Sequence, residues 1–377
     1  MKKQLLLCGI AALAFCSCSN DETIESANLR SSQITFSPSV GNMSRAVTTV
    51  NNLDQFTVNA YLNQGDAPMY YIKDLNVKKE SGVWTSAQAY TWPYSGQMTF
   101  FSYSPADLSV NMPASAEVAA EAPTITYTAS SNPERQKDLL YAVNVMDAAK
   151  AYAPGSNSTT VNVNFRHALS QVVFSAKNTN PGWILDISDV QIVNIKSKGV
   201  YTFPTQTTAP FSADGDVVRG SWALENVVNS YSASFSAATS IGAEAVELTS
   251  SSDGALLVLP QTAAAWDPAT DPSCQSNGCY FMVRCKIQQI TPDGNALLWP
   301  SKSTDTAAYV AIPVNIDWQE GKKYTYTFIF GDGAGFIPPT STEGGETVIP
   351  GSTTLAKINF SVSVDDFQEA GNKNMEM

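Results

Sequence analysis

Short stretches in which apolar and polar residues alternate recur along almost the whole chain. In such a stretch every second side chain points to the same face, which is typical of a β-strand with one buried side. Clusters of Gly, Pro, Asn and Asp separate the stretches, as turns between strands do. The best helical signal spans only residues 132–140, where Asn132 before Pro133 suits an N-cap. The chain is therefore predicted to be all-β and to fold as β-sandwiches.

The length of the chain favours two domains. Without the N-terminal signal described below, about 360 residues remain, which is more than one core usually organises. A segment rich in Gly, Pro, Ser and Thr at residues 151–160 lies near the middle, and the strand pattern restarts after it. We therefore predict an N-terminal β-sandwich domain over residues 46–160 and a C-terminal one over residues 161–377.

The N-terminus has the features of an export signal. Two lysines precede an apolar run at residues 5–15 that is too short to span a bilayer. Ser17 then precedes Cys18, a sequence that resembles the lipobox of bacterial lipoproteins, in which this cysteine is acylated. Residues 1–17 are accordingly predicted to be a lipoprotein signal peptide. An acylated Cys18 would anchor the chain to the outer membrane at the cell surface.

The charge of the chain excludes several classes of partner. The formal net charge is -12, and removal of the two signal lysines makes it -14. Such acidity argues against binding to nucleic acid and against electrostatic attraction to anionic membranes. Charged residues make up only 15% of the chain, so Ser, Thr, Asn and Gln supply most of its polarity, as is common in secreted β proteins.

Three cysteines lie beyond the signal region, at positions 274, 279 and 285. A turn-like sequence, Gln-Ser-Asn-Gly, separates Cys274 from Cys279, which fits a local disulfide between them. The alternative is three unpaired thiols. Cys285 shares strand parity with Phe281 and is predicted to be a buried thiol. The spacing of these cysteines and the lack of a nearby histidine argue against a zinc site.

No group of residues in the sequence indicates catalysis. His167 is the single histidine, and its parity with Phe165 predicts a core residue rather than a catalyst. The sequence has neither an HExxH motif nor a Gly-rich phosphate loop with lysine. Asp365 and Asp366 are adjacent on a predicted strand and would point to opposite faces, so they do not form a carboxylate pair for glycoside hydrolysis. We predict that the protein is not an enzyme and has no metal or cofactor.

One short strand occurs twice, near opposite ends of the chain. ITFSPSV at residues 34–40 recurs as INFSVSV at residues 358–364, and five of the seven positions are identical. Pro38 removes a ladder donor from the first copy, which predicts that this copy holds its sheet less firmly. One interpretation is that the two copies compete for the same groove. The alternative is that the second copy is simply the last strand of its own C-terminal domain. The apolar face of each copy would consist of Ile34, Phe36 and Val40, and of Ile358, Phe360, Val362 and Val364.

Five motifs in series give the chain a family resemblance. They are WPYSGQMTFFSYSP at 92–105, QKDLLYA at 136–142, VNFRHALSQVVFSA at 163–176, LLVLPQ at 256–261 and DWQEGKKYTYTF at 317–328. In this order, behind the lipobox-like cysteine, they resemble the fimbrillin superfamily of Bacteroidales, the Mfa-like and fimbrillin A pilins. The resemblance implies two transthyretin-like β-sandwich domains in tandem. It also implies a structural or adhesive fimbrial subunit that is exported as a lipoprotein.

The family pattern further implies maturation by a protease and assembly by strand exchange. A cut after an arginine releases the first strand, and a strand from another subunit then fills the groove. Arg45 matches the maturation arginine, whereas a cut at the runner-up, Arg30, would leave the first strand attached. The implied segments are a lipidated propeptide at 18–45 and a candidate donor strand at 355–364. The implied partners are other copies or related pilin subunits, a trypsin-like protease and an adhesion ligand of host or bacterial origin.

A monomeric surface glycan-binding lipoprotein is the alternative function. The chain has seven tryptophans, which could provide a stacking platform for sugars. Trp92 and Trp318 lie in motifs that start strands and are predicted to pack in the core. Trp266 and Trp299 are next to turn residues and are the better candidates for exposure. A glycan binder would keep its first strand and stay monomeric, whereas a pilin would lose it and polymerise.

Overall fold

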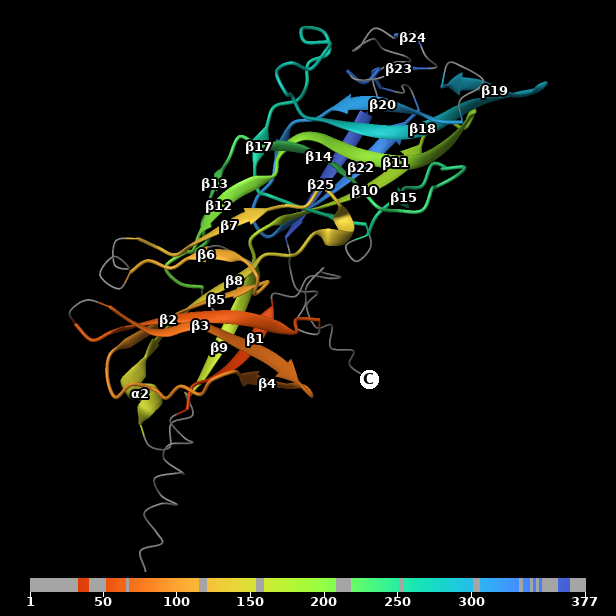
Figure 1. Ribbon diagram of the computed structural model, residues 1–377. Helices are drawn as coiled ribbons and strands as arrows, with labels where there is room; N and C mark the ends of the chain where they lie inside the picture. Colours follow the sequence, from red (N-terminus) through yellow and green to blue (C-terminus); the bar gives the residue numbers. More distant parts are fainter. Residues whose placement is uncertain are drawn as a thin grey trace, which may run out of the picture.

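The computed structural model confirms the all-β prediction. Its strands lie in two tiers along the long axis of the molecule, with the N-terminal tier below the C-terminal tier in Figure 1. Among the described residues, helical structure is limited to the short elements η1 (Pro133–Arg135) and α2 (Ala148–Tyr152). The structure describes residues 33–40, 52–65, 68–114, 121–153, 159–207, 218–250, 254–300, 306–331, 335–339, 342–343, 346–347 and 359–366.

A seven-stranded sheet forms the N-terminal tier. Its strand order is β1-β9-β8-β5-β2-β3-β4, and β1 and β9 are its one parallel pair of neighbours. β1 is therefore an edge strand that is held by a segment far along the chain. The strands are β1 (Thr35–Val40), β2 (Gln55–Asn63), β3 (Met69–Glu80), β4 (Val83–Ser86), β5 (Gln97–Ser104), β8 (Leu140–Asp147) and β9 (Thr160–His167).

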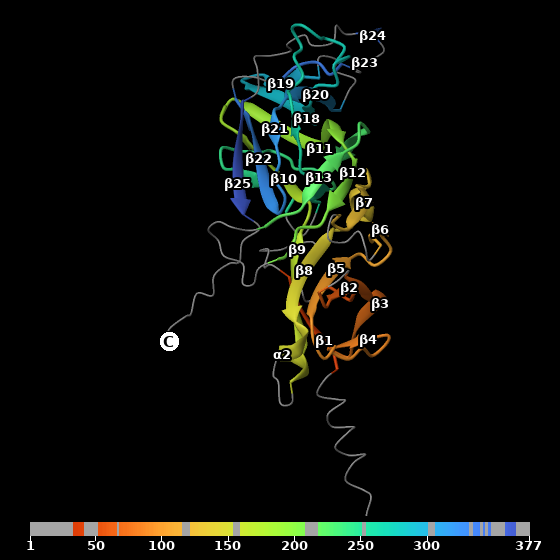
Figure 2. The same cartoon turned by 90° about the vertical axis from the view of Figure 1, so that its left-hand side faces the viewer.

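Two five-stranded sheets form the C-terminal tier. The first has the order β15-β10-β22-β25, with β16 also paired to β10, and the second has the order β14-β11-β18-β19, with β20 also paired to β18. Their strands are β10 (Ser170–Asn178), β15 (Val246–Glu247), β16 (Leu256–Val258), β22 (Lys322–Phe330), β25 (Asn359–Asp366), β11 (Trp183–Lys196), β14 (Val228–Ser232), β18 (Tyr280–Thr291), β19 (Gly294–Trp299) and β20 (Ala308–Pro313). Figure 2 shows β25, in dark blue, at the edge beside β22.

Smaller sheets complete the fold. A four-stranded sheet of order β13-β12-β7-β6 joins strands from both halves of the sequence near the junction of the tiers. Two short hydrogen-bonded pairs, β17 with β21 and β23 with β24, lie in the C-terminal half of the sequence. These strands are β6 (Ser109–Asn111), β7 (Thr124–Thr128), β12 (Lys198–Thr202), β13 (Ser221–Leu224), β17 (Thr262–Ala263), β21 (Ile316–Asp317), β23 (Thr342–Glu343) and β24 (Glu346–Thr347).

Only two residues, Ala168 and Leu169, separate the strands on either side of the crossing between the tiers. β9 ends at His167 in the N-terminal sheet, and β10 begins at Ser170 in a C-terminal sheet. The N-terminal sheet thus extends past the divide that the sequence suggested at residue 160. Because β7 pairs with β12, strands from either side of that position also share one sheet.

The central strands β2 and β5 of the seven-stranded sheet are largely buried on both faces. On β5, Phe100 is fully buried in a cluster that also contains Phe36, Phe56 and Phe165, and we call this cluster the N-terminal core. The next residue, Phe101, belongs to the large cluster that fills the C-terminal tier. Adjacent residues of a strand point to opposite faces, so one strand serves both cores. The two tiers are consequently packed together through this sheet.

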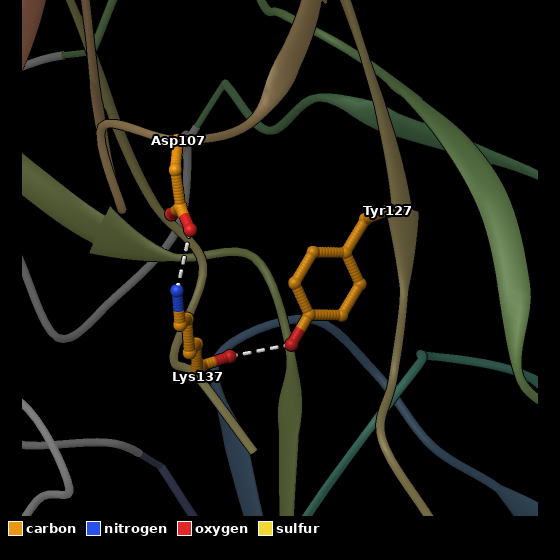
Figure 3. A network of polar contacts seen from close by, with 3 residues as sticks. All are labelled: Asp107, Tyr127 and Lys137. Carbon is orange, nitrogen blue, oxygen red and sulfur yellow. Dashed lines mark hydrogen bonds and ion pairs between the residues drawn. The ribbon is translucent and has the colours of Figure 1, made fainter. Parts of the chain in front are cut away.

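The weak helical signal at residues 132–140 corresponds to a single turn, η1, in the structure. Asn132 does act as the N-cap, since its side-chain oxygen accepts a hydrogen bond from Glu134 N at 3.0 Å. The single turn ends at Arg135, and the chain then extends into β8. Polar contacts hold this segment in place, because Lys137 Nζ lies 2.6 Å from Asp107 Oδ2 and Lys137 O accepts a hydrogen bond from the Tyr127 hydroxyl (Figure 3). These tertiary contacts outweigh the weak helical pattern.

Candidate functional site

The candidate site for strand exchange is β1 together with the N-terminal core that it completes. Ile34, Phe36 and Val40 are buried, at 2%, 7% and 5% exposure, and Pro38 between them is buried as well. The residues that alternate with them are exposed. The Phe36 ring packs edge-on against Phe56 and Phe100, with centroid distances of 6.3 and 6.2 Å. β1 is thus an edge strand that contributes a full row of side chains to the core.

The backbone of β1 bonds to β9 through alternate residues. Thr35 N donates to Thr159 O at 3.3 Å, and the parallel register continues to Val40 opposite Phe165. Ile34 N points to the other side and donates to Tyr90 O at 2.8 Å. Side chains add two bonds across the pair, between Thr35 and Thr160 and from Ser39 to Asn164.

This alternation corrects the expected role of Pro38. Because Thr35 faces β9 with its backbone N–H, residue 37 does so too, and the backbone nitrogen of Pro38 faces away from β9. The proline therefore costs the β1–β9 ladder no hydrogen bond, contrary to the sequence-based argument. Instead it removes a donor from the outer edge of the sheet, where proline hinders the pairing of a further strand.

The second copy of the repeated strand also lies at a sheet edge. β25 pairs antiparallel with β22 of the same chain, with Val362 opposite Tyr326 and Val364 opposite Tyr324. Ile358, the first residue of the second copy, lies outside the described residues, as does the rest of the candidate donor segment before β25. Both copies of the repeat therefore occupy edge positions, one in each tier.

β1 and β22 follow one another along the same edge of the β9–β10 segment. Thr159 O accepts from β1, and Leu169 O accepts from Gly321 N, just before β22 begins. Ala168 N, by contrast, donates to Leu139 O on the opposite side. Residues of equal parity face the same edge of a strand, so β1 and β22 are successive occupants of a single edge.

Three predicted processing positions lie outside the described residues: Cys18, Arg30 and Arg45. β1 ends at Val40, and β2 begins at Gln55. Arg45 thus lies in the connection between the first two strands of the sequence. Those two strands are not neighbours in the sheet.

A buried carboxyl at the junction of the tiers was not predicted. Glu320, in the turn before β22, is 9% exposed, and its Oε1 accepts hydrogen bonds from the hydroxyls of Tyr141 and Tyr201. Arg219 Nη1 donates to Glu320 O at 2.6 Å. Burial raises the pKa of Glu320 to about 7, although the tyrosine bonds and the cationic Arg219 and Arg166 act in the opposite direction. In the sequence, Glu320 looks like an ordinary turn residue between Gln319 and Gly321.

The predicted disulfide is absent, and Cys274 and Cys279 are both free thiols. Cys274 packs in a small cluster with Trp266 and Tyr280, whereas Cys279 points into the large C-terminal core. Their sulfurs thus belong to different clusters. Cys285 is fully buried, which confirms the prediction for that residue.

The predicted exposure of two tryptophans is wrong. Trp266 and Trp299 are 1% and 2% exposed, and both indole N–H groups are bonded, to Asp271 O and Ala308 O. The Trp266 ring packs against Tyr280 and Phe336, and Trp299 belongs to the large cluster of the C-terminal tier. Trp92 and Trp318 are also buried, as predicted. The stacking platform that would favour the glycan-binding alternative is therefore not formed by these residues.

His167 is a core residue, as predicted. Its side chain is 4% exposed, and Nδ1 lies 2.7 Å from Asp138 Oδ2, a side chain that is itself buried. Within the described part of the chain, His, Cys, Asp and Glu side chains form no group of three that could hold a metal ion. Among the same residues no helix has the length and apolar character needed to cross a membrane.

These features define an all-β protein of two tiers whose first strand is an edge strand of the N-terminal core. The model of the fimbrillin-like family matches residues 44–363, which is most of the chain. The protein therefore belongs to the fimbrillin-like family, and the resemblance of the five sequence motifs is confirmed. Membership of this family makes it a structural, non-enzymatic protein.

Solved structures of similar fold come from Bacteroides species. A fimbrial protein from Bacteroides vulgatus ATCC 8482 is 16% identical with a TM-score of 0.55, and the match covers 89% of this chain and 100% of that one. A candidate cell adhesion protein from Bacteroides uniformis ATCC 8492 is 14% identical with a TM-score of 0.42, covering 89% and 99% of the two chains. The first likeness supports the fold described above. No curated protein matches the chain.

The contribution of β1 to stability is open to a direct test. Phe36→Ala should lower the free energy of unfolding by about 3 kcal/mol, because it leaves a cavity among aromatic rings. Ser37→Ala, on the exposed face of the same strand, should change it by less than about 0.5 kcal/mol. Urea titration of the full chain measures both. Equal stability of the two variants would show that β1 does not complete the core.

The buried carboxyl predicts a specific pH dependence. Because the folded-state pKa of Glu320 is about 7 and its ordinary value is 4.5, the unfolded chain ionises first, and stability falls as pH rises from 4.5 to 7. Glu320→Gln removes this loss, so at pH 8 the variant should be more stable than wild type by about 3 kcal/mol. At pH 4 the difference should nearly vanish. Urea titrations at both pH values, with Glu134→Gln as the exposed control, test this, and a pH-independent difference would contradict it.

Proposed function

We propose that this protein is a pilus or adhesion subunit of the cell surface, exported as a lipoprotein through Cys18 and polymerised by strand exchange after cleavage at Arg45. Family membership supports the role as a pilus or adhesion subunit. The observation that supports strand exchange is the position of β1. It is a parallel edge strand whose inward side chains complete the N-terminal core. Other copies of the chain or related pilin subunits are the partners that this mechanism requires.

Removal of β1 would open a groove of defined chemistry. Its four inward side chains contribute roughly 6 to 10 kcal/mol of gross apolar burial before ordering costs. Their loss would expose the rings of Phe56 and Phe100 and the outer edge of β9. An extended segment with apolar residues at every second position would hydrogen-bond to the free edge of β9 and would fill the groove with its apolar side chains. A trypsin-like cut after Arg45 would release β1 and leave β2 intact, whereas a cut after Arg30 would not release it.

The second copy of the repeat has the side chains that such a groove accepts. Superposition of the two sequences places Phe360 where Phe36 lies, and Val362 where Pro38 lies. Among the strands that the structure describes, β25 is bonded to β22 alone, so its departure would separate no other described pair. As a donor to another copy, it would enter the groove parallel to β9.

The cleavage site is tested by treatment of the purified lipid-free chain with a trypsin-like protease. Mass spectrometry should find a new N-terminus at Ala46, because Arg45 joins β1 to the rest of the fold. Arg45→Ala should lose this product, and Arg30→Ala should keep it. A folded product that begins at Ser31 in the wild type would overturn the assignment.

The donor strand is tested by assembly after the same cut. Cleaved wild-type chains should form SDS-resistant ladders, since a strand bound in the groove adds both ladder bonds and apolar burial. Chains without residues 355–377 should be cut at the same position and remain monomeric. Ladders of equal length from the truncated chain would show that another segment fills the groove. Monomers from both chains would show that β25 only closes its own tier.

A further inference from the structure

A cavity of about 390 Å³ that opens widely to solvent lies in the C-terminal half of the fold, and none of its lining residues comes from β1 or the N-terminal core. Three segments that are distant in sequence form its walls: the start of β13, the connection from β16 to β17, and the turn between β21 and β22. They bring together two indoles, Trp222 and Trp318, with Arg219, Gln261 and Glu320. Its volume falls within the usual range of small-molecule sites.

Hydrogen bonds fix the walls of this cavity before any ligand arrives. Trp222 Nε1 donates to Ala168 O at 2.9 Å, and Trp318 Nε1 donates to Tyr326 Oη at 3.0 Å. The Gln261 amide bonds to the backbone of Lys196 through both its oxygen and its nitrogen. Side chains that are already held in one rotamer lose little entropy on binding.

The position of Trp222 at the cavity wall is set by close packing. Its ring lies against Tyr201, with centroids 5.2 Å apart, and the indole is only half-buried. Gly220 is needed beside it, because a Cβ atom there would lie 2.3 Å from both the Tyr201 hydroxyl and Thr202 O. A rigid, partly exposed indole is a surface on which the apolar face of a sugar ring can stack.

The charges of the cavity favour an acidic ligand. Among the residues that line it, Arg219 is the one cation and Glu320 the one carboxyl. Burial raises the pKa of Glu320 to about 7, so this carboxyl is largely neutral below that pH. Arg219 spends one of its five N–H donors on Glu320 O, and a guanidinium pairs with a carboxylate through two parallel bonds. The guanidinium of Arg219, on an exposed residue at this cavity, is therefore the group to which an acid would bind.

We propose that this cavity binds a sugar ring that carries a carboxylate, with Trp222 stacking on the ring and Arg219 pairing with the acid group. The exposed amide of Gln319 and hydroxyl of Thr262 at the same cavity would bond to ring hydroxyls. The site is separate from the strand-exchange groove. A subunit with such a site would recognise acidic glycans whether or not it polymerises.

The test is to titrate the uncleaved full chain with D-glucuronic acid and with glucose at pH 6. Binding is measured by isothermal titration calorimetry and by tryptophan fluorescence. Glucuronic acid should bind at least tenfold more tightly than glucose, since one charge-assisted pair separates the two ligands. Arg219→Gln should remove this preference. Trp222→Ala should weaken binding of both sugars at least tenfold.

Matched variants guard against a loss of folding. Arg135→Gln removes an exposed arginine elsewhere, Trp84→Ala removes a half-buried tryptophan in the N-terminal tier, and both should bind like wild type. Arg219→Gln removes an exposed side chain, so its fold can be verified by an unchanged urea transition. Equal binding of glucose and glucuronic acid, undetectable binding of both, or full binding by the Arg219 and Trp222 variants would each overturn the proposal.

Discussion

The fold depends on one nearly continuous extended segment, β9 followed by β10, which passes from the lower tier to the upper. On one edge this segment carries β1 and then β22, and on the other it carries β8 and then β16. The same stretch of backbone therefore provides a strand to the main sheet of each tier. The cores on the two faces of the N-terminal sheet then lock the tiers together, since alternate residues of β5 enter different cores.

The two edge strands of the repeat are treated differently by the fold. β1 is anchored by its side chains in the N-terminal core, and Pro38 leaves its outer edge short of a donor. β25 lies outside β22, and because residues 359–366 include no proline, each of them has a backbone N–H donor. A nearly identical sequence therefore has two local roles, which sequence identity alone does not distinguish.

Much of the fold was predictable from the sequence because a period of two fixes which side chains share a face. The inward row Ile34, Phe36 and Val40 followed from this pattern alone. Pairing partners did not, since β1 bonds to β9 across a separation of 125 residues that no local pattern encodes. The burial of Trp266 and Trp299 was missed for a related reason, because turn residues nearby say nothing of what packs over them. Glu320 and Arg219 meet only through tertiary contacts, so the sequence held no signal for either the buried carboxyl or the cavity beside it.

The parallel alignment of β1 with β9 has a mechanical consequence. When two hydrogen-bonded strands are pulled in opposite directions along their length, every bond of the ladder is strained at once, in shear. When they are peeled apart from one end, the bonds break one after another. A strand in the β1 position that is pulled along its own length meets the first situation, and the Phe36 ring must slide past Phe56 and Phe100 as well. The same strand is therefore held most firmly against tension along its own length and least firmly against a force that lifts one end away from the sheet.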